Sequence, residues 1–270
     1  MVERMRVPEF LAGRGDLAIE DRFFTQLRVG NGVFKMTHRH RFDDTLPQTL
    51  DLIARHPGGV LDVACSSAIS TVELARALTQ RGILREVHGT DAVVHTMYLE
   101  RGDCGVLLDR RGMVLQVDHP RWAIARRPGR RDLVRHPWRV VHALAVRAHV
   151  MSGATRATPL DLVSSLVAGS GVTIHEEDLR APHVAGSFGF VRVANILNRS
   201  YFSESELLEL VAAVVARVAE GGVAFFVRTK KDGTNHGTYF ERRGSSLVEI
   251  ARVGAGSEIK ELVLRAAHAR

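Results

Sequence analysis

The sequence predicts an α/β protein whose mainly parallel sheet carries helices on both faces. Short apolar runs rich in β-branched residues alternate with amphipathic helical patterns, which is typical of βαβ units. One run, at residues 60–63, passes through a group of small residues into a helical pattern at 69–81. A second helical pattern begins at a Ser203/Glu206 capping box and leads into an apolar run at 223–227. Runs that are apolar throughout indicate strands buried on both faces.

The composition is that of a globular protein with one large domain and additions to it. Its 270 residues are 45% hydrophobic, which is enough for a packed core. The formal net charge of +7 is compatible with an anionic partner, such as a nucleic acid, a phosphorylated metabolite or a membrane surface, but does not require one. Two cysteines are too few for a disulfide framework and match no zinc pattern. We therefore expect a reducing, cytoplasmic location.

No stretch of the sequence has the pattern of a secretory signal or a membrane span. Residues 1–10 alternate charged and apolar side chains. The most apolar stretch, 207–227, is interrupted by Arg217, Glu220 and a pair of glycines. We therefore expect no membrane partner.

The turn after residues 60–63 has the features of a nucleotide-binding turn. Asp62 lies near the carboxyl end of the predicted strand, and the next residues are small enough for a ligand to approach the amides that begin the helix. This turn resembles motif I of the class I S-adenosylmethionine-dependent methyltransferases, acidic-x-Gly-x-Gly-x-Gly. Ala64, Ser66 and Ala68 stand where the glycines would be, although Ala and Ser resist positive φ. The Cys65-Ser66 pair also resembles, weakly, the loop of the chemotaxis receptor methyltransferases.

The resemblance implies a Rossmann-like fold of the class I methyltransferase type, with S-adenosyl-L-methionine (SAM) as cofactor. Its motif I loop would bind the cofactor through Asp62, Ala64, Cys65, Ser66 and Ala68. Asp91 ends the second predicted strand, where a carboxylate accepts hydrogen bonds from the ribose. Asp178 and the amide of Leu179 match the positions that contact adenine, and Asn195 follows the fourth strand. These positions fall at the carboxyl ends of parallel strands, which meet at one edge of such a sheet.

The loop after the fourth predicted strand is expected to border the methyl acceptor. It supplies Asn198, Arg199 and Tyr201 as substrate-side candidates. Methyl transfer depends mainly on the alignment of a nucleophile, so a base is optional, and the catalytic residue stays unassigned. If the acceptor must lose a proton, His183, His236 and Tyr201 are the candidate bases. No metal-ligand pattern occurs.

The Rossmann-like methyltransferase domain is expected to span 43–270. Three further features are expected before it or within it. Residues 1–42 are expected to form an N-terminal extension or lid. An Arg-rich insertion at about 95–150 contains a predicted hairpin and two tryptophans, Trp122 and Trp138, and is either a substrate contact or a solvated surface. After a polar turn at 230–237, strands at 238–243, 247–253 and 259–264 are predicted to form an antiparallel hairpin at the sheet edge in place of a fifth crossover helix.

Three functions are compatible with these features. The favoured function is a SAM-dependent methyltransferase that acts on a small molecule or a protein side chain. The net charge and the Arg/Trp insertion leave open a nucleic-acid-binding protein or RNA methyltransferase. The loss of three loop glycines leaves open a Rossmann-like protein without methyltransferase activity. The sequence does not indicate an oligomeric state.

Overall fold

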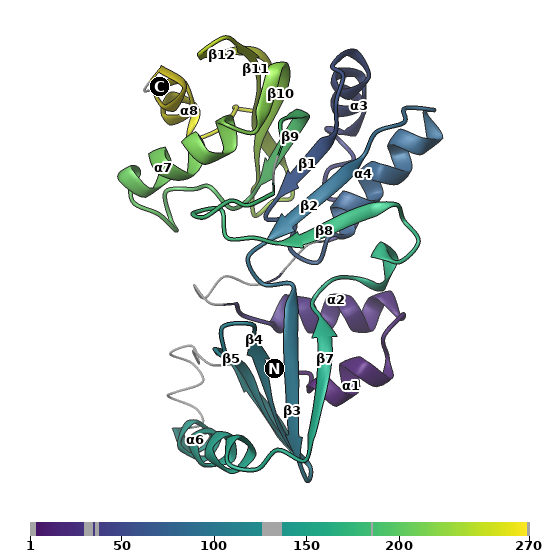
Figure 1. Ribbon diagram of the computed structural model, residues 1–270, viewed down its shortest axis with the longest axis vertical. Coiled ribbons are helices and arrows are strands. Elements are labelled where there is room, and N and C mark those ends of the chain that lie inside the picture. Colours follow the sequence, from purple (N-terminus) through teal and green to yellow (C-terminus); the bar gives the residue numbers. More distant parts are fainter. Residues whose placement is uncertain (1–3, 30–34, 36–37, 126–136, 185, 269–270) are drawn as a thin grey trace. The chain divides into compact units, whose positions relative to one another are not determined.

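The computed structural model describes residues 4–29, 35, 38–125, 137–184 and 186–268, and the chain divides into two compact units (Figure 1). The antiparallel-sheet unit joins residues 1–37 to residues 93–166. The parallel-sheet unit contains residues 38–92 and 167–270. The chain therefore builds two strands of the parallel sheet, passes into the other unit at residue 93, and returns before the third strand of the parallel sheet.

The parallel-sheet unit is built on seven strands in the order β12-β11-β10-β9-β1-β2-β8. The five strands β10, β9, β1, β2 and β8 run parallel to one another. At one edge, β11 pairs antiparallel with β10, and β12 pairs antiparallel with β11. The strands are β1 (Val60–Val63), β2 (Val87–Asp91), β8 (Val172–Glu176), β9 (Phe188–Ala194), β10 (Val218–Thr229), β11 (Asn235–Arg243) and β12 (Ser246–Val253). The predicted mainly parallel α/β sheet is thus confirmed.

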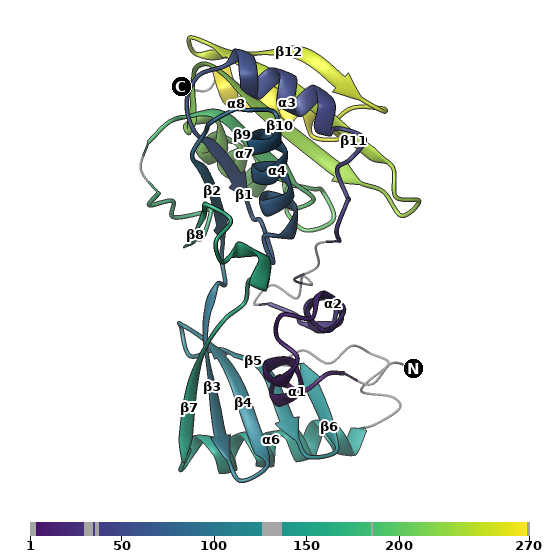
Figure 2. The same cartoon turned by 90° about the vertical axis from the view of Figure 1, so that its right-hand side faces the viewer.

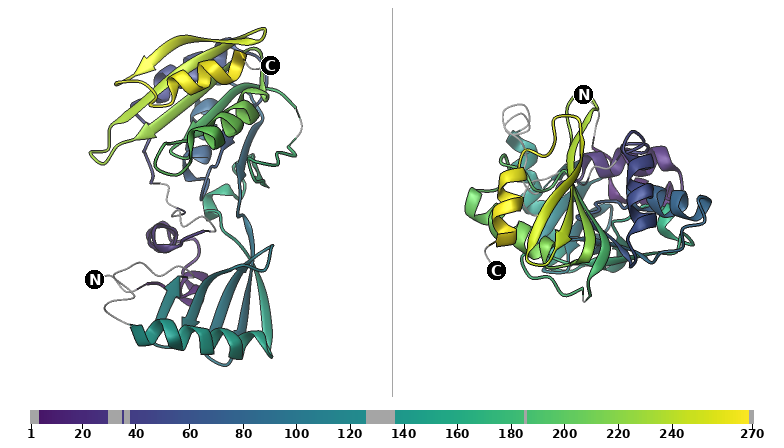
Figure 3. Two further views of the ribbon diagram at one scale, coloured as in Figure 1. Left: turned by 90° about the vertical axis from the view of Figure 1, so that its left-hand side faces the viewer. Right: turned by 90° about the horizontal axis from the view of Figure 1, so that it is seen from above.

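Helices cover both faces of this sheet (Figure 3). α3 (Leu46–Arg55) and α4 (Ile69–Gln80) lie on one face, and α7 (Glu204–Val215) and α8 (Lys260–His268) lie on the other. The largest apolar cluster fills the space beneath α7 and α8, and its buried residues include Leu61, Val63, Val191, Val193, Leu207, Val211, Phe226, Phe240, Leu262 and Val263. No helix connects β8 to β9 among the described residues of that crossover.

Two predicted boundaries in this unit were wrong. Residues 259–264, predicted as a strand, belong to the turn before α8 and to α8 itself. Their apolar residues Ile259, Leu262 and Val263 recur with Ala266 at helical spacing, and all four are buried. The helical pattern expected to lead into the apolar run at 223–227 also ends earlier, because α7 ends at Val215 and the glycines at 221 and 222 lie inside β10, at an irregularity in its pairing with β9.

The antiparallel-sheet unit has five strands in the order β6-β5-β4-β3-β7. They are β3 (His95–Arg101), β4 (Cys104–Asp109), β5 (Val114–His119), β6 (Trp122–Ala125) and β7 (Arg156–Asp161). α1 (Val7–Ala12) and α2 (Leu17–Gln26) pack on one face through a cluster of three phenylalanines, and α6 (Pro137–Met151) packs on the other (Figure 2). The expected N-terminal extension and the expected insertion therefore belong to one folded unit.

A buried ion pair joins the centre of the parallel sheet to α4. Arg192 on β9 donates two hydrogen bonds to Asp62 on β1, from Nε to Oδ1 at 2.9 Å and from Nη2 to Oδ2 at 2.6 Å. Thr71 donates to Asp62 Oδ2 at 2.5 Å, and Ser70 Oγ accepts from Arg192 Nη2 at 3.2 Å. Burial has the largest single effect and would lower the pKa of Arg192, but the charge of Asp62, its hydrogen bonds and smaller contributions from Cys65 and Glu73 together raise the net pKa. The guanidinium also lies 5.0 Å from the centre of the Phe42 ring.

We expect Asp62→Ala to lower the free energy of unfolding by about 3–5 kcal/mol, because it leaves the Arg192 charge buried without its partner. Adding Arg192→Met should recover part of that loss, since the unpaired charge is then removed. Urea unfolding of both single variants and the double variant measures the coupling. Asp51→Ala, which breaks an exposed ion pair with Arg81, is the matched control and should cost about 1 kcal/mol or less. Strictly additive losses for Asp62 and Arg192 would contradict the pairing.

Candidate cofactor site

The carboxyl ends of the parallel strands meet at one edge of the sheet. Val63 of β1 is in register with Thr90 of β2 and with Val193 of β9, and Asp91 is in register with Glu176 of β8. The residues that follow these strands therefore share one edge. This is where ligands bind in open α/β sheets.

The loop from residue 64 to residue 68 has the backbone of a glycine-rich turn without its glycines. Ala64 has φ of 56°, Ser66 of 60° and Ala68 of 62°. These three residues occupy the positions where the motif has glycine, and they adopt the conformation that the sequence analysis expected them to resist. A left-handed residue other than glycine costs roughly 1–2 kcal/mol. Strain of this kind persists where the surroundings fix the backbone, and it concentrates at functional sites.

Polar groups of this loop are arranged as a ligand would require. The hydroxyls of Ser66 and Ser67 are buried and have no hydrogen-bond partner. Such a group costs about 1–3 kcal/mol unless something binds it. No side chain caps the amino end of α4, which follows Ala68 directly. A ligand with hydroxyl, amino or carboxylate groups fits these donors and acceptors, and the residues therefore fit the nucleoside cofactor that the motif implies.

Asp91 lies directly beside this loop. Its Oδ2 accepts a hydrogen bond from the amide of Ser66 at 2.9 Å. The amide of Cys65 donates to the carbonyl of Thr90 at 2.9 Å, which ties the loop to the end of β2. Close packing requires Gly89 at this point, since a Cβ there would lie 2.9 Å from the sulfur of Cys65. Hydrogen bonds and close packing thus hold Asp91 and the loop together.

Not every predicted cofactor residue points its side chain at a ligand. Asp62 is 1% exposed, and both its oxygens are bonded to Arg192 or Thr71. Cys65 and Ala68 are also buried, at 4% and 0% exposure, so their side chains do not reach the edge. Asp62 was expected to contact the cofactor, and its ion pair with Arg192 was not predicted. The signal was present in the sequence, because one arginine inside an otherwise apolar strand indicates a buried acidic partner.

The predicted adenine contacts lie at the same edge, beyond Asp91. The amide of Glu177 donates to the carbonyl of Asp91 at 2.8 Å, so Asp178 and Leu179 follow immediately. Asp178 is half-buried and accepts a hydrogen bond from the amide of Arg180 at 3.0 Å. Leu179 packs against the main apolar cluster. Their predicted contacts with an adenine stay predictions.

Asn195 anchors a polar network on the other side of the loop. It has φ of 64°, and its side-chain oxygen accepts from the amide of Thr229 at 2.7 Å. The Thr229 hydroxyl bonds to Asn235 at 2.8 Å and accepts from Arg41 Nε at 3.0 Å. Burial lowers the pKa of Arg41. Arg41 belongs to the segment expected to form an N-terminal extension or lid, and its link to the sheet edge was not predicted from the sequence.

The substrate-side candidates differ in how free their side chains are. Asn198 is 2% exposed and its side chain bonds to its own loop, donating to the carbonyls of Asn195 and Ile196 and accepting from the amide of Ser200. Arg199 lies 3.6 Å from a carboxylate oxygen of Glu204 at the surface. Tyr201 is 52% exposed. Only Arg199 and Tyr201 therefore present side chains to solvent.

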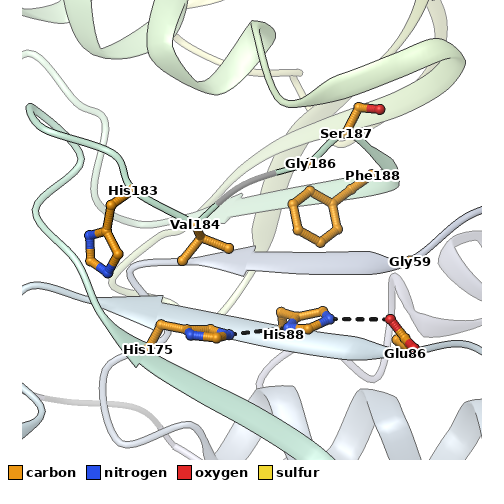
Figure 4. A pocket seen from close by; sticks show the side chains of 9 residues that line it. All are labelled: Gly59, Glu86, His88, His175, His183, Val184, Gly186, Ser187 and Phe188. Atoms are coloured by element: carbon orange, nitrogen blue, oxygen red, sulfur yellow. Dashed lines mark hydrogen bonds and ion pairs between the residues drawn. The ribbon is translucent and has the colours of Figure 1, made fainter.

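Two candidate bases lie away from the motif I loop. His236 Nδ1 accepts from the amide of Ala255 at 2.8 Å, next to the antiparallel edge of the sheet. His183 lines a separate pocket of about 510 Å³ near the amino ends of β1, β2 and β9 (Figure 4). In that pocket His88 Nδ1 lies 3.2 Å from His175 Nε2. The pKa of His175 is lowered, mainly by burial and secondly by repulsion from His88.

Comparisons with known proteins give a likeness of fold. No family model and no curated protein matches the sequence. The glycopeptide N-methyltransferase MtfA, complexed with S-adenosylhomocysteine, is 11% identical with a TM-score of 0.39, covering 87% of this chain and 82% of its own. A SAM-dependent methyltransferase from Clostridium acetobutylicum is 10% identical with a TM-score of 0.38, covering 86% and 80%.

Other matched structures are considerably longer than this chain. An O-methyltransferase family protein from Burkholderia thailandensis is 15% identical with a TM-score of 0.37, and the match covers 80% of this chain but 42% of that protein. Magnesium protoporphyrin IX methyltransferase from Synechocystis is covered to 64%. The chain thus spans less than two thirds of these proteins. At such identities and TM-scores we base the function on the residues of this chain alone.

We expect Ser66→Gly to raise the free energy of unfolding by about 1 kcal/mol relative to Ser66→Ala, because only glycine relieves the left-handed strain. Both variants remove the unpartnered hydroxyl. The difference between their free energies of unfolding therefore isolates the cost of the left-handed backbone at residue 66. Thermal or urea unfolding of the two proteins measures it. If Ser66→Ala is as stable as Ser66→Gly or more stable, residue 66 is not held at positive φ.

We expect Glu177→Gln to destabilise the protein near neutral pH and to lose that effect in acid. Burial raises the pKa of Glu177, but hydrogen bonds from Arg217 and from the amides of Val184 and His183 outweigh it, and the net pKa lies below the usual 4.5. A lowered pKa contributes stability above about pH 4.5, which is lost as the pH falls through the folded-state value. Urea unfolding of wild type and variant across this range tests it, and a constant difference would contradict it.

Proposed function

We propose that this protein is a SAM-dependent methyltransferase that acts on a small molecule or a protein side chain. The observation that carries the proposal is the loop at 64–68. Three residues at the motif's glycine positions keep left-handed backbones at the carboxyl end of β1, two hydroxyls there have no partner, and Asp91 bonds to the same loop. Backbone strain of this kind concentrates at functional sites, which favours a binding role for the turn.

The residues at this edge suit the parts of the cofactor. Asp91 would accept hydrogen bonds from the two ribose hydroxyls, in addition to the Ser66 amide it already accepts. The uncapped amino end of α4 suits the carboxylate of the cofactor's methionine part. The hydroxyls of Ser66 and Ser67 suit other polar groups of the cofactor. Asp178 and the amide of Leu179 would contact the adenine. When bound, SAM would supply a methyl group on a positively charged sulfur, whose carbon a nucleophile can attack with S-adenosylhomocysteine as the leaving group.

The acceptor would approach from the side of β9 and β10. A hydrogen-bonded group of polar side chains lies there, formed by Asn195, Thr229 and Arg41. This group would orient a substrate and hold an anionic group near the methyl donor. Tyr201 and Arg199 present exposed side chains on the neighbouring loop. An acceptor hydroxyl or amine would release its proton to solvent or to Tyr201, whereas a carboxylate acceptor would need no base.

The alternative of nucleic-acid binding through the Arg/Trp insertion is not favoured. Trp122 is 3% exposed and stacks on His119, so its face is not available to a base. Most of the arginines that motivated the alternative, at 126, 127, 130, 131 and 135, lie outside the described residues. No specific observation supports a Rossmann-like protein without a ligand.

We expect S-adenosylhomocysteine to bind the full chain in titration calorimetry, and Asp91→Asn to weaken binding about 5- to 150-fold. The reason is that the carboxylate which pairs with the ribose hydroxyls is lost, at a cost of about 1–3 kcal/mol. Glu86→Gln, just before the amino end of the same strand and highly exposed, is the matched control and should bind like wild type. Absence of heat with the wild-type chain would overturn the proposed function. Equal affinity in Asp91→Asn would place the ribose elsewhere.

A further inference from the structure

α6 carries an exposed apolar stripe on its outer side. Seven large apolar side chains are exposed among the described residues, and four of them, Trp138, Val141, Leu144 and Met151, lie on this one helix. Their exposed fractions are 54%, 70%, 64% and 47%. The helical spacing places them within an arc of about 140°. Single exposed apolar residues need no explanation, but a concentration of them marks an interaction site.

The stripe is not the face that holds α6 to its own unit. Ala143, Val146 and Val150 are buried against β4, β5 and β6, where they pack with Val106, Val117 and Ile124. The helix is therefore apolar on two opposite sides. One side is already satisfied by the sheet, which fixes the helix and presents the other side outward as a rigid ridge of 15 residues, about 22 Å long.

The charge of α6 favours one class of partner. The helix contains no acidic residue, and its polar residues are Arg139, His142, Arg147 and His149. His142, Arg147 and His149 are exposed and flank the stripe. Antiparallel pairing with a second copy would bring these basic groups together, which is unfavourable. A surface that offers both apolar contact and negative charge suits the helix better.

We propose that α6 docks the protein on the surface of an anionic lipid bilayer. The helix lies parallel to the membrane plane, with Val141, Leu144 and Met151 in the acyl boundary and the indole of Trp138 at the headgroup level. Arg147 pairs with lipid phosphates. None of the helices in the described part of the chain has the length and apolar character to cross a bilayer, so the attachment is peripheral. This revises the expectation from the sequence that the protein has no membrane partner, and it is independent of the proposed methyl transfer.

Vesicle binding of the full chain tests the proposal, with Trp138 as the probe. With phosphatidylcholine vesicles that contain phosphatidylglycerol, the protein should sediment with the lipid and its emission should shift to the blue. Trp138→Phe should abolish the shift, because Trp122 is already buried. Leu144→Ser should weaken binding at least about tenfold, and Arg147→Gln about fivefold on anionic vesicles alone. Leu84→Ser, at an exposed leucine of the other unit, is the matched control and should bind like wild type.

Three results would overturn the proposal. The first is no sedimentation with anionic vesicles. The second is equal weakening by Leu84→Ser and Leu144→Ser, which would mean that the stripe has no special role. The third is a wild-type dimer, seen by sedimentation velocity, that Leu144→Ser dissociates, since a second copy would then cover the stripe. Circular dichroism confirms that each variant is folded, and Trp138→Phe keeps an aromatic ring beside Trp122, which Trp138 contacts edge-to-face.

Discussion

The ion pair between Asp62 and Arg192 fixes both ends of the turn on which the site depends. Asp62 belongs to the strand that enters the turn, and Ser70 and Thr71, which bond to the pair, belong to the helix that leaves it. Arg192 comes from the neighbouring strand β9 and is 3% exposed. Breaking a pair of this kind leaves an uncompensated buried charge, so the strand, the helix and the neighbouring strand are held in one arrangement.

This arrangement explains how alanine and serine keep a backbone that usually requires glycine. The turn connects two fixed points, and its path between them passes through three left-handed residues. The cost, roughly 1–2 kcal/mol at each residue, is offset by the ion pair, the buried helix face and the bond from the Cys65 amide to β2. The replaced glycines therefore alter the stability of the turn more than its shape. The hydroxyls of Ser66 and Ser67 stay buried in this turn without a partner.

Much of the fold could be predicted from the sequence, because it depends on local patterns. The apolar runs and the capping box at Ser203 predicted β1, β9, α7 and the core of β10, and the polar residues at strand ends predicted which edge would carry the site. Long-range pairing could not be predicted in this way. Nothing in residues 1–37 indicates that they pack with the strands of 93–166. The short segment at 259–264 has apolar residues that suit either a strand or a helix, and its contact with α7 decides in favour of the helix.

The structure places some of the predicted site residues at one edge of the sheet, whereas their contacts with a cofactor stay predictions. Asp91 lies against the loop as expected, but Asp62 and Asn198 bond to neighbours inside the protein, which a list of polar residues at strand ends cannot reveal. The left-handed turn was missed for a physical reason. Intrinsic preference disfavours positive φ for Ala and Ser, and only the tertiary contacts around Asp62 override it.

The most direct test of the account is a crystal structure of the chain grown with S-adenosylhomocysteine. The account predicts that the nucleoside lies across the carboxyl ends of β1 and β2, with its ribose hydroxyls on Asp91 and its polar groups bonded to the hydroxyls of Ser66 or Ser67. Density for the ligand elsewhere on the protein, with those hydroxyls still unpartnered, would contradict it.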